Sequence, residues 1–267
     1  MGKRIWIIIA LVFLLSSCQS LNRAGESEGK VGSSFKEVQL NENGANHLEK
    51  AIGLLKDDLS FDISNKNVLR NTTENDMVET SIVVENKYES TSGIYHKKTR
   101  VFSGVEEQYS EIYTDSKVAY IKYNDNKWIK KSLEELKTKF DMNGKAAILN
   151  YLENIKSESS NFSFEEENDK YIYSYIILED SNIKSEFLSF IFGEKVPEKT
   201  DSISFDDFKC RCEIYKETYK VKSIEVFLKY RIKVDDHENI VESERTLEVI
   251  SIGESFKMVL PVEGIDK

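Results

Sequence analysis

Apolar residues recur at helical spacing in four segments of the chain. In the first, Leu48, Ala51, Ile52 and Leu55 fall on one side of a helix, because residues three and four apart lie on the same face. The other three show the same spacing, and the last of them ends at a glycine, a common helix stop. The pattern therefore predicts helices over residues 46–59, 132–140, 144–157 and 181–193.

Elsewhere the apolar period is two, or β-branched and aromatic residues run together, which indicates strands. Val118–Tyr123 and Trp128–Lys131 flank a turn and predict a hairpin, whereas Asn65–Asn75 is predicted to be a loop. Further strands are predicted over residues 77–88, 93–102, 106–115, 161–168, 169–180, 208–219, 220–234, 239–252 and, closing the chain, 255–261. Strand runs interrupted by helices, with tight turns between neighbouring strands, predict an α+β class with a mainly antiparallel sheet. Several strands exceed ten residues, which favours a large, strongly curved sheet.

A basic head of Lys3 and Arg4 precedes the uninterrupted apolar run Ile5–Leu15. A membrane-spanning helix needs about 20 apolar residues, so this run is too short to span and fits the core of a signal peptide. The order Leu-Ser-Ser-Cys that ends at Cys18 resembles the lipobox of bacterial lipoproteins. The resemblance implies that residues 1–17 are a signal peptide, and that Cys18 becomes an N-terminus carrying diacylglycerol.

Two acyl chains anchor a protein stably, so the expected location is the extracytoplasmic face of the cell membrane, with the diacylglyceryl group on Cys18 as the contact. The alternative is an ordinary signal peptide whose cysteine is incidental. Residues 18–34 are small and polar and are predicted to be the lipidated N-terminus and a flexible tether. Residues 35–267 are predicted to be a single α+β domain.

The net charge of the chain limits the classes of partner that it is expected to bind. The formal net charge is −10 and becomes −12 once the two cations of the leader are removed. Such an acidic domain is predicted not to bind nucleic acid, nor to dock electrostatically on anionic lipid headgroups.

The hairpin "IYTDSKVAYIKYNDNKWIKKS" and the ending, two long charged strands followed by "ESFKMVLPVEG", resemble lipoproteins with the fold of the carrier protein LolA and of the mycobacterial LppX group. Several low-GC Gram-positive lipoproteins look similar. The resemblance implies a half-open antiparallel barrel with helices packed on its concave face and an apolar cavity for acyl chains. Those families offer no catalytic residues to carry over, so neither an enzymatic activity nor a cofactor is expected.

Cys210 and Cys212 stand two apart on a predicted strand and therefore point to one side, together with Phe208 and Ile214. One interpretation is a pair of small core residues. The other is a disulfide, because the compartment outside the membrane can oxidise thiols. The Cα atoms would lie about 6.5–7 Å apart, at the limit of what a bridge tolerates.

The three histidines, His47, His96 and His237, are scattered, so neither a catalytic site nor a metal site is predicted. The remaining candidate is the predicted helix over residues 181–193, which is apolar on nearly all sides. It is either a buried core helix or a helix with one side on the sheet and another lining a ligand cavity. The residues expected to line such a cavity are Ile183, Phe187, Phe190 and Ile191.

Two functions remain open from the sequence. The first is a non-enzymatic, membrane-anchored protein that binds a lipid or another hydrophobic ligand. The second is a protein-interaction or structural envelope lipoprotein, such as an immunity or assembly factor, with a solid core and no ligand. A ligand cavity favours the first function and a filled interior favours the second.

Overall fold

The computed structural model describes residues 42–57, 60–73, 76–115, 117–124, 126–133, 144–158, 161–178, 203–234, 237–261 and 265–266. Its elements in chain order are α2 (Glu42–Lys56), β1 (Phe61–Thr72), β2 (Met77–Glu89), β3 (Ile94–Ser103), β4 (Glu106–Thr114), β5 (Val118–Tyr123), β6 (Trp128–Ser132), α3 (Gly144–Ser157), β7 (Ser163–Glu166), β8 (Lys170–Leu178), β9 (Ile203–Tyr215), β10 (Val221–Val234), β11 (His237–Ile252) and β12 (Ile265–Asp266).

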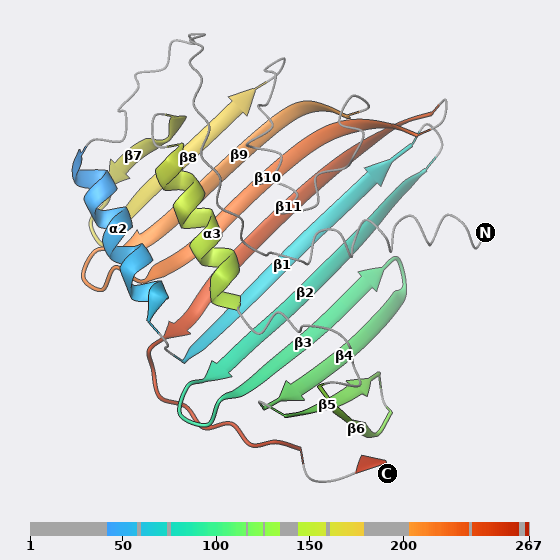
Figure 1. Ribbon diagram of the computed structural model, residues 1–267. Coiled ribbons are helices and arrows are strands. Elements are labelled where there is room, and N and C mark those ends of the chain that lie inside the picture. The colour runs from blue at the N-terminus through green and yellow to red at the C-terminus, as the bar shows by residue number, and fades with distance from the viewer. Residues whose placement is uncertain are drawn as a thin grey trace.

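All the described strands belong to one twisted sheet, in the order β12-β6-β5-β4-β3-β2-β1-β11-β10-β9-β8-β7 (Figure 1). Eleven strands pair antiparallel, and β12 pairs parallel with β6. Both edge strands are short, with four residues in β7 and two in β12. They lie at opposite ends of the sheet, so the sheet is open.

Helices α2 and α3 lie side by side on one face of the sheet, over its β7–β11 end (Figure 1). We call this the inner face and the opposite one the outer face. The apolar stripes of the two helices pack on the sheet because each helix can bury only one side. The core cluster between helices and sheet includes Leu48, Ala51, Ile52, Leu55, Ile148, Leu152, Ile155, Phe61, Ile63, Tyr173, Phe208, Cys210, Cys212 and Leu247.

The predicted fold class is wrong. The residues predict a large curved antiparallel sheet, and the resemblance implies a half-open barrel with helices closing its concave face, whereas the described residues form an open sheet with two helices over one end. Closing a barrel requires the two edge strands to pair along their length. Edge strands of four and two residues at opposite ends of the sheet provide no such seam.

Two smaller predictions are also wrong. The loop predicted over Asn65–Asn75 is mostly strand, because residues as far as Thr72 belong to β1 and pair with both β2 and β11. Asparagine is disfavoured in strands, but hydrogen bonding along both edges outweighs that preference. The strand predicted over residues 255–261 is not formed, since that stretch has no regular structure.

The predicted helices over residues 46–59 and 144–157 are confirmed as α2 and α3, and the predicted hairpin is confirmed as β5–β6. The hairpin turn places Asn124 at a φ of 48°, which asparagine tolerates better than most residues. The predicted helix over 181–193 and the leader and tether over 1–34 lie outside the described residues. So does the predicted helix over 132–140 from residue 134 onward, while its first residue, Ser132, ends β6. Of the described helices, none combines the length and the apolar character needed to cross a membrane.

Candidate functional site

The residues that the sequence singles out for lipid contact are not among those described. Cys18 and the predicted cavity residues Ile183, Phe187, Phe190 and Ile191 all lie outside the described ranges. Any ligand site that the structure describes must therefore lie on the described part of the sheet.

Cys210 and Cys212 lie on the inner face of β9, beneath the two helices. Both are free thiols, and they are 2% and 0% exposed. Burial raises the pKa of Cys210 to about 12 and raises that of Cys212 as well, so neither thiol ionises near neutral pH. The core interpretation of the pair is confirmed, and the disulfide is not formed.

The described histidines do not come together. His47, on α2, stacks on Tyr171 of β8 with ring centroids 3.9 Å apart, and His96 lies in β3. His237 begins β11. Within the described ranges, no group of three or more His, Cys, Asp or Glu side chains is arranged to hold a metal ion.

His96 forms a buried polar unit on the outer face with Glu111 and Tyr109 of β4. Its Nε2 lies 2.8 Å from Oε1 of Glu111, and the Tyr109 hydroxyl donates to the other carboxylate oxygen at 2.5 Å. Burial lowers the pKa of His96, and the bond to Glu111 offsets this only in part. Burial also disfavours ionisation of Glu111, but the bonds from Tyr109 and His96 outweigh it and lower the pKa of that carboxyl.

Because both oxygens of Glu111 are already bonded within the unit, we assign the unit a structural role. It ties β3 to β4 on the outer face. This unit is not predicted from the sequence, although the period-two alternation does place His96 and Glu111 on one face of neighbouring predicted strands.

The inner face continues past the helices over β2, β3 and β4, where apolar residues alternate with polar ones such as Lys97, Ser110 and Gln108. Ile82 is opposite Val101, while Val84 is opposite Thr99, and Ile112 is opposite Ile121 of β5. Residues paired across an antiparallel ladder point to the same side of the sheet. We call the inner side of these strands the open inner face, defined by the half-buried residues Ile82, Val84, Thr99, Val101 and Ile112.

The outer side of the same strands is predominantly charged and polar. Val83 lies there between Lys66 and Arg100, and Lys98 pairs across the ladder with Glu111. A sheet that alternates in this way is built to contact apolar material on one side and water on the other. The open inner face therefore calls for an apolar partner, and the two described helices do not supply it.

Polar amides border the open inner face on the side toward the helices. Asn65 and Asn71 of β1 lie opposite Val84 and Val78, and the Oδ1 atom of each is buried without a hydrogen-bond partner. Between them, Asn67 accepts a bond from Ser243. Buried polar atoms without partners are rare and costly, so an incoming donor would be favoured here. The three asparagines lie in the segment that the sequence predicts to be a loop, which is why this border is not predicted.

A groove of about 520 Å³ lies at one end of the sheet, between the β2–β3 turn and residues 255–258. Glu89, at the end of β2, accepts bonds from Ser92 at 2.7 Å and from the backbone of Met258 at 2.9 Å. The bond from Met258, followed by that from Ser92, lowers the pKa of Glu89. Through its Oε2 the carboxylate therefore holds the C-terminal segment against the turn.

A protein-family model matches residues 45–263, nearly all of the described sheet and both helices. Its description is "Family of unknown function (DUF6612)". The chain belongs to the DUF6612 family. No curated protein matches this DUF6612 chain.

Three solved structures are similar to the DUF6612 chain at low identity. A LolA superfamily protein from Nitrosomonas europaea is 11% identical, with 80% of this chain and 94% of that chain covered and a TM-score of 0.21. A β-barrel-like DUF1849 protein from Brucella abortus is 7% identical, with 72% and 98% covered and a TM-score of 0.26. A DUF1329 family protein from Desulfovibrio piger is 8% identical, with 80% and 94% covered and a TM-score of 0.22.

The first of these belongs to a group that the hairpin and the terminal segment resemble. At such TM-scores none of the three carries an argument about how this chain is built or what it binds.

Proposed function

We propose that this DUF6612 protein is a lipid-anchored protein of the extracytoplasmic face of the cell membrane, and that it binds a hydrophobic ligand on the open inner face without catalysing a reaction. The observation that carries the ligand proposal is the continuation of the apolar inner face beyond the two described helices. The unpartnered amide oxygens of Asn65 and Asn71 beside it favour an amphiphile, with apolar chains on β2–β4 and a hydrogen-bond donor toward β1.

Two other occupants of this face make different predictions. A segment of the same chain would make the interior a solid core, and a second protein would make the face an interface. Either would leave the purified protein without bound lipid. The lipid content of the protein therefore separates the proposal from both.

Two adjacent valines of β2 provide a matched pair of variants. Val84 lies on the open inner face between Asn65 and Thr99, whereas Val83 lies on the outer face between Lys66 and Arg100, and both are half-buried. Val84→Glu places a carboxylate against the ligand, and an uncompensated polar group costs about 1–3 kcal/mol, so bound lipid should fall about tenfold or more. Val83→Glu meets two cations instead and should leave the bound lipid unchanged.

The measurement is lipid per protein by mass spectrometry after mild detergent extraction, with circular dichroism to check that both variants fold. Equal lipid content in the two variants would show that the open inner face is not the binding site. Val84→Thr keeps the side-chain volume and should retain an amount of bound lipid between those of the wild type and Val84→Glu. This variant keeps the test informative if Val84→Glu does not fold.

The anchor is tested separately. Replacing Cys18 with alanine removes the only thiol in the lipobox-like sequence, so the chain should remain an uncleaved precursor that incorporates no labelled fatty acid. A Cys210→Ala variant is the control and should be processed and labelled like the wild type. Acylation of the Cys18→Ala chain, or its cleavage after Ser17, would refute the anchor.

A further inference from the structure

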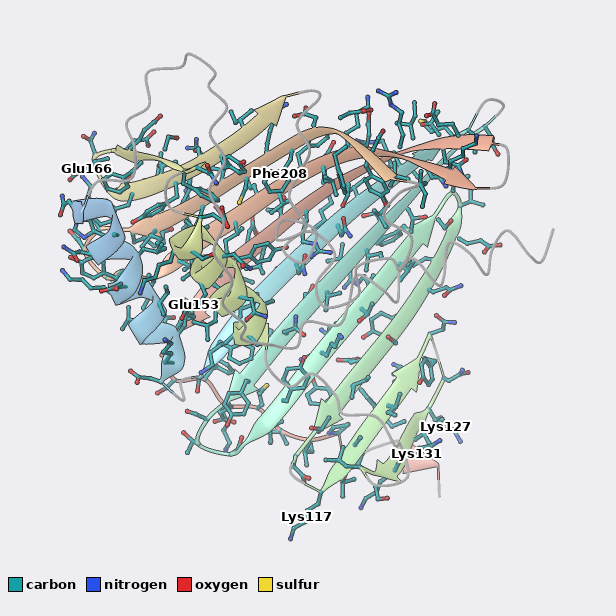
Figure 2. All side chains as sticks on the ribbon, turned by 45° about the horizontal axis from the view of Figure 1, so that its top comes forward. Lys117, Lys127, Lys131, Glu153, Glu166 and Phe208 are labelled. Atoms are coloured by element: carbon teal, nitrogen blue, oxygen red, sulfur yellow. The ribbon has the colours of Figure 1, made fainter. Side chains whose placement is uncertain are left out.

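Lysines gather on the β5–β6 hairpin at one end of the sheet. Residues 117–133 hold five lysines and one aspartate, a formal net charge of +4 in a chain whose total is −10. Figure 2 shows Lys117, Lys127 and Lys131 at this end and Glu153 and Glu166 at the opposite end. The net charge of the whole chain therefore conceals a basic segment at this end of the sheet.

Four of the hairpin lysines form no ion pair within the described residues, whereas two lysines at the opposite end of the sheet do. At the opposite end Lys56 pairs with Glu153 at 3.1 Å and Lys216 pairs with Glu166 at 2.8 Å. Across the described ranges, by contrast, the ion pairs do not include Lys117, Lys122, Lys130 or Lys131. The nearby carboxylate of Asp115 instead accepts the backbone amides of Lys117 and Val118, at 2.7 and 2.8 Å.

Aromatic and apolar side chains stand among these lysines. Tyr123 is 51% exposed and Ile129 is 38% exposed. Lys122 lies 6.0 Å from the ring centroid of Trp128, and the Lys130 ammonium lies 5.7 Å from that of Tyr120. Lysine next to tryptophan and tyrosine is the composition of protein surfaces that rest at the level of lipid headgroups, where the cation meets phosphate and the ring meets the acyl boundary.

We propose that the β5–β6 hairpin, through Lys117, Lys122, Lys130 and Lys131 together with Trp128 and Tyr123, docks on anionic phospholipid headgroups. A flat membrane contacts only this end of the sheet. A nucleic acid long enough to pass along the sheet would also meet its acidic remainder and be repelled. The proposal goes beyond ligand binding and does not depend on it.

The length of chain before α2 allows this orientation. The N-terminal end of α2 lies at β8, because Tyr173 donates to the carbonyl oxygen of Gly44 at 2.7 Å. The strand order places β6 nine strands from β8, a span of about 45 Å at the usual strand spacing. The 24 residues from Cys18 to Asn41 can reach up to about 80 Å when extended.

Tryptophan fluorescence tests the docking directly. The chain has two tryptophans, Trp6 and Trp128, so Trp6→Phe leaves the hairpin residue as the sole reporter. The full chain is extracted from membranes and reconstituted in vesicles of phosphatidylcholine with or without phosphatidylglycerol. Either the apolar run Ile5–Leu15 or a lipid on Cys18 then holds it on the vesicle, so the test is independent of processing.

With phosphatidylglycerol, Trp128 emission should shift to the blue and be quenched by brominated lipid, and 1 M salt should reverse both changes because the screening length falls to about 3 Å. Replacing Lys117, Lys130 and Lys131 by glutamine should lower the ratio of docked to undocked hairpins by up to about 100-fold, at about fivefold per lysine. Lys122 is kept because it adjoins the reporter ring.

The matched control replaces three exposed lysines elsewhere, Lys66, Lys233 and Lys257, which changes the net charge equally. It should behave like the unsubstituted reporter chain. Three results would overturn the proposal: the same emission with and without phosphatidylglycerol, an equal response of the two triple variants, or a response to single-stranded DNA at equal phosphate concentration that exceeds the response to vesicles.

Discussion

Replacing Phe208 with alanine is expected to lower the free energy of unfolding by about 3–5 kcal/mol. Phe208 is 0% exposed on the inner face of β9, opposite Leu228 of β10, and its ring meets that of Tyr175 edge-on at 5.8 Å. Truncation removes this buried surface and leaves a void that neighbours on hydrogen-bonded strands cannot close. In urea the unfolding midpoint should fall by about 1–2 M with an unchanged slope.

Phe102→Ala is the matched control, because Phe102 is also on a strand but is 36% exposed on the outer face of β3. It should lower the unfolding free energy by less than about 1 kcal/mol. Similar losses for the two variants would contradict a core beneath α2 and α3.

Replacing Glu213 with glutamine is expected to lower the unfolding free energy by about 1–2 kcal/mol at neutral pH. Glu213 lies on the outer face of β9 and is 8% exposed. Its Oε1 accepts from Lys170 at 3.0 Å and from Arg211 at 2.9 Å, and its Oε2 accepts from Lys222 at 3.0 Å. Loss of the carboxylate leaves three cations facing one another. Arg211 and Lys222 are partly exposed, so solvent screening reduces the cost.

The pH dependence of this effect has a definite sign. Burial disfavours ionisation of Glu213, but the bonds from Lys170, Lys222 and Arg211 outweigh it and lower the pKa from the usual 4.5 to about 2. A carboxyl with a lowered folded-state pKa stabilises the fold above its unfolded pKa and loses that contribution as pH falls through the folded value. The difference in unfolding free energy between wild type and Glu213→Gln should therefore reach its full size above pH 4.5 and vanish near pH 2.

Urea unfolding of both proteins at several pH values measures this gap. Glu248→Gln serves as the control, because Glu248 is exposed on β11, two strands from β9, and forms no ion pair within the described chain. A gap that stays constant between pH 7 and pH 2 would mean that the network around Glu213 does not act through its charge.

The elements whose apolar residues recur at a regular helical or strand spacing could be predicted from the sequence. The stripe of Leu48, Ala51, Ile52 and Leu55 gives α2, and the apolar–turn–apolar pattern gives the β5–β6 hairpin. The central strand could not be predicted, since Asn65, Asn67 and Asn71 favour turns and only pairing on both edges makes that segment extended. The barrel prediction failed because strand length indicates curvature but not whether edge strands meet.

The candidate site could be predicted only in part. The alternation along β2 and β3 already separates an apolar face from a charged one, but which strands the helices leave open depends on the packing of the whole sheet. The two buried amide oxygens without hydrogen-bond partners beside that face belong to β1. Because the sequence predicts a loop in place of that strand, the position of these amides could not be predicted either. The basic character of the hairpin is hidden by the net charge of the whole chain, and only the structure shows that Lys117, Lys122, Lys130 and Lys131 form no ion pair within the described ranges.

The central claim is that the open inner face holds a hydrophobic ligand, and native mass spectrometry of the wild-type protein released from its membrane tests it most directly. The account predicts a mass excess, beyond any group attached to Cys18, that is removed by organic solvent and identified as an amphiphile at about one per chain. A spectrum that shows only the chain and its covalent anchor, with the fold intact, would contradict it.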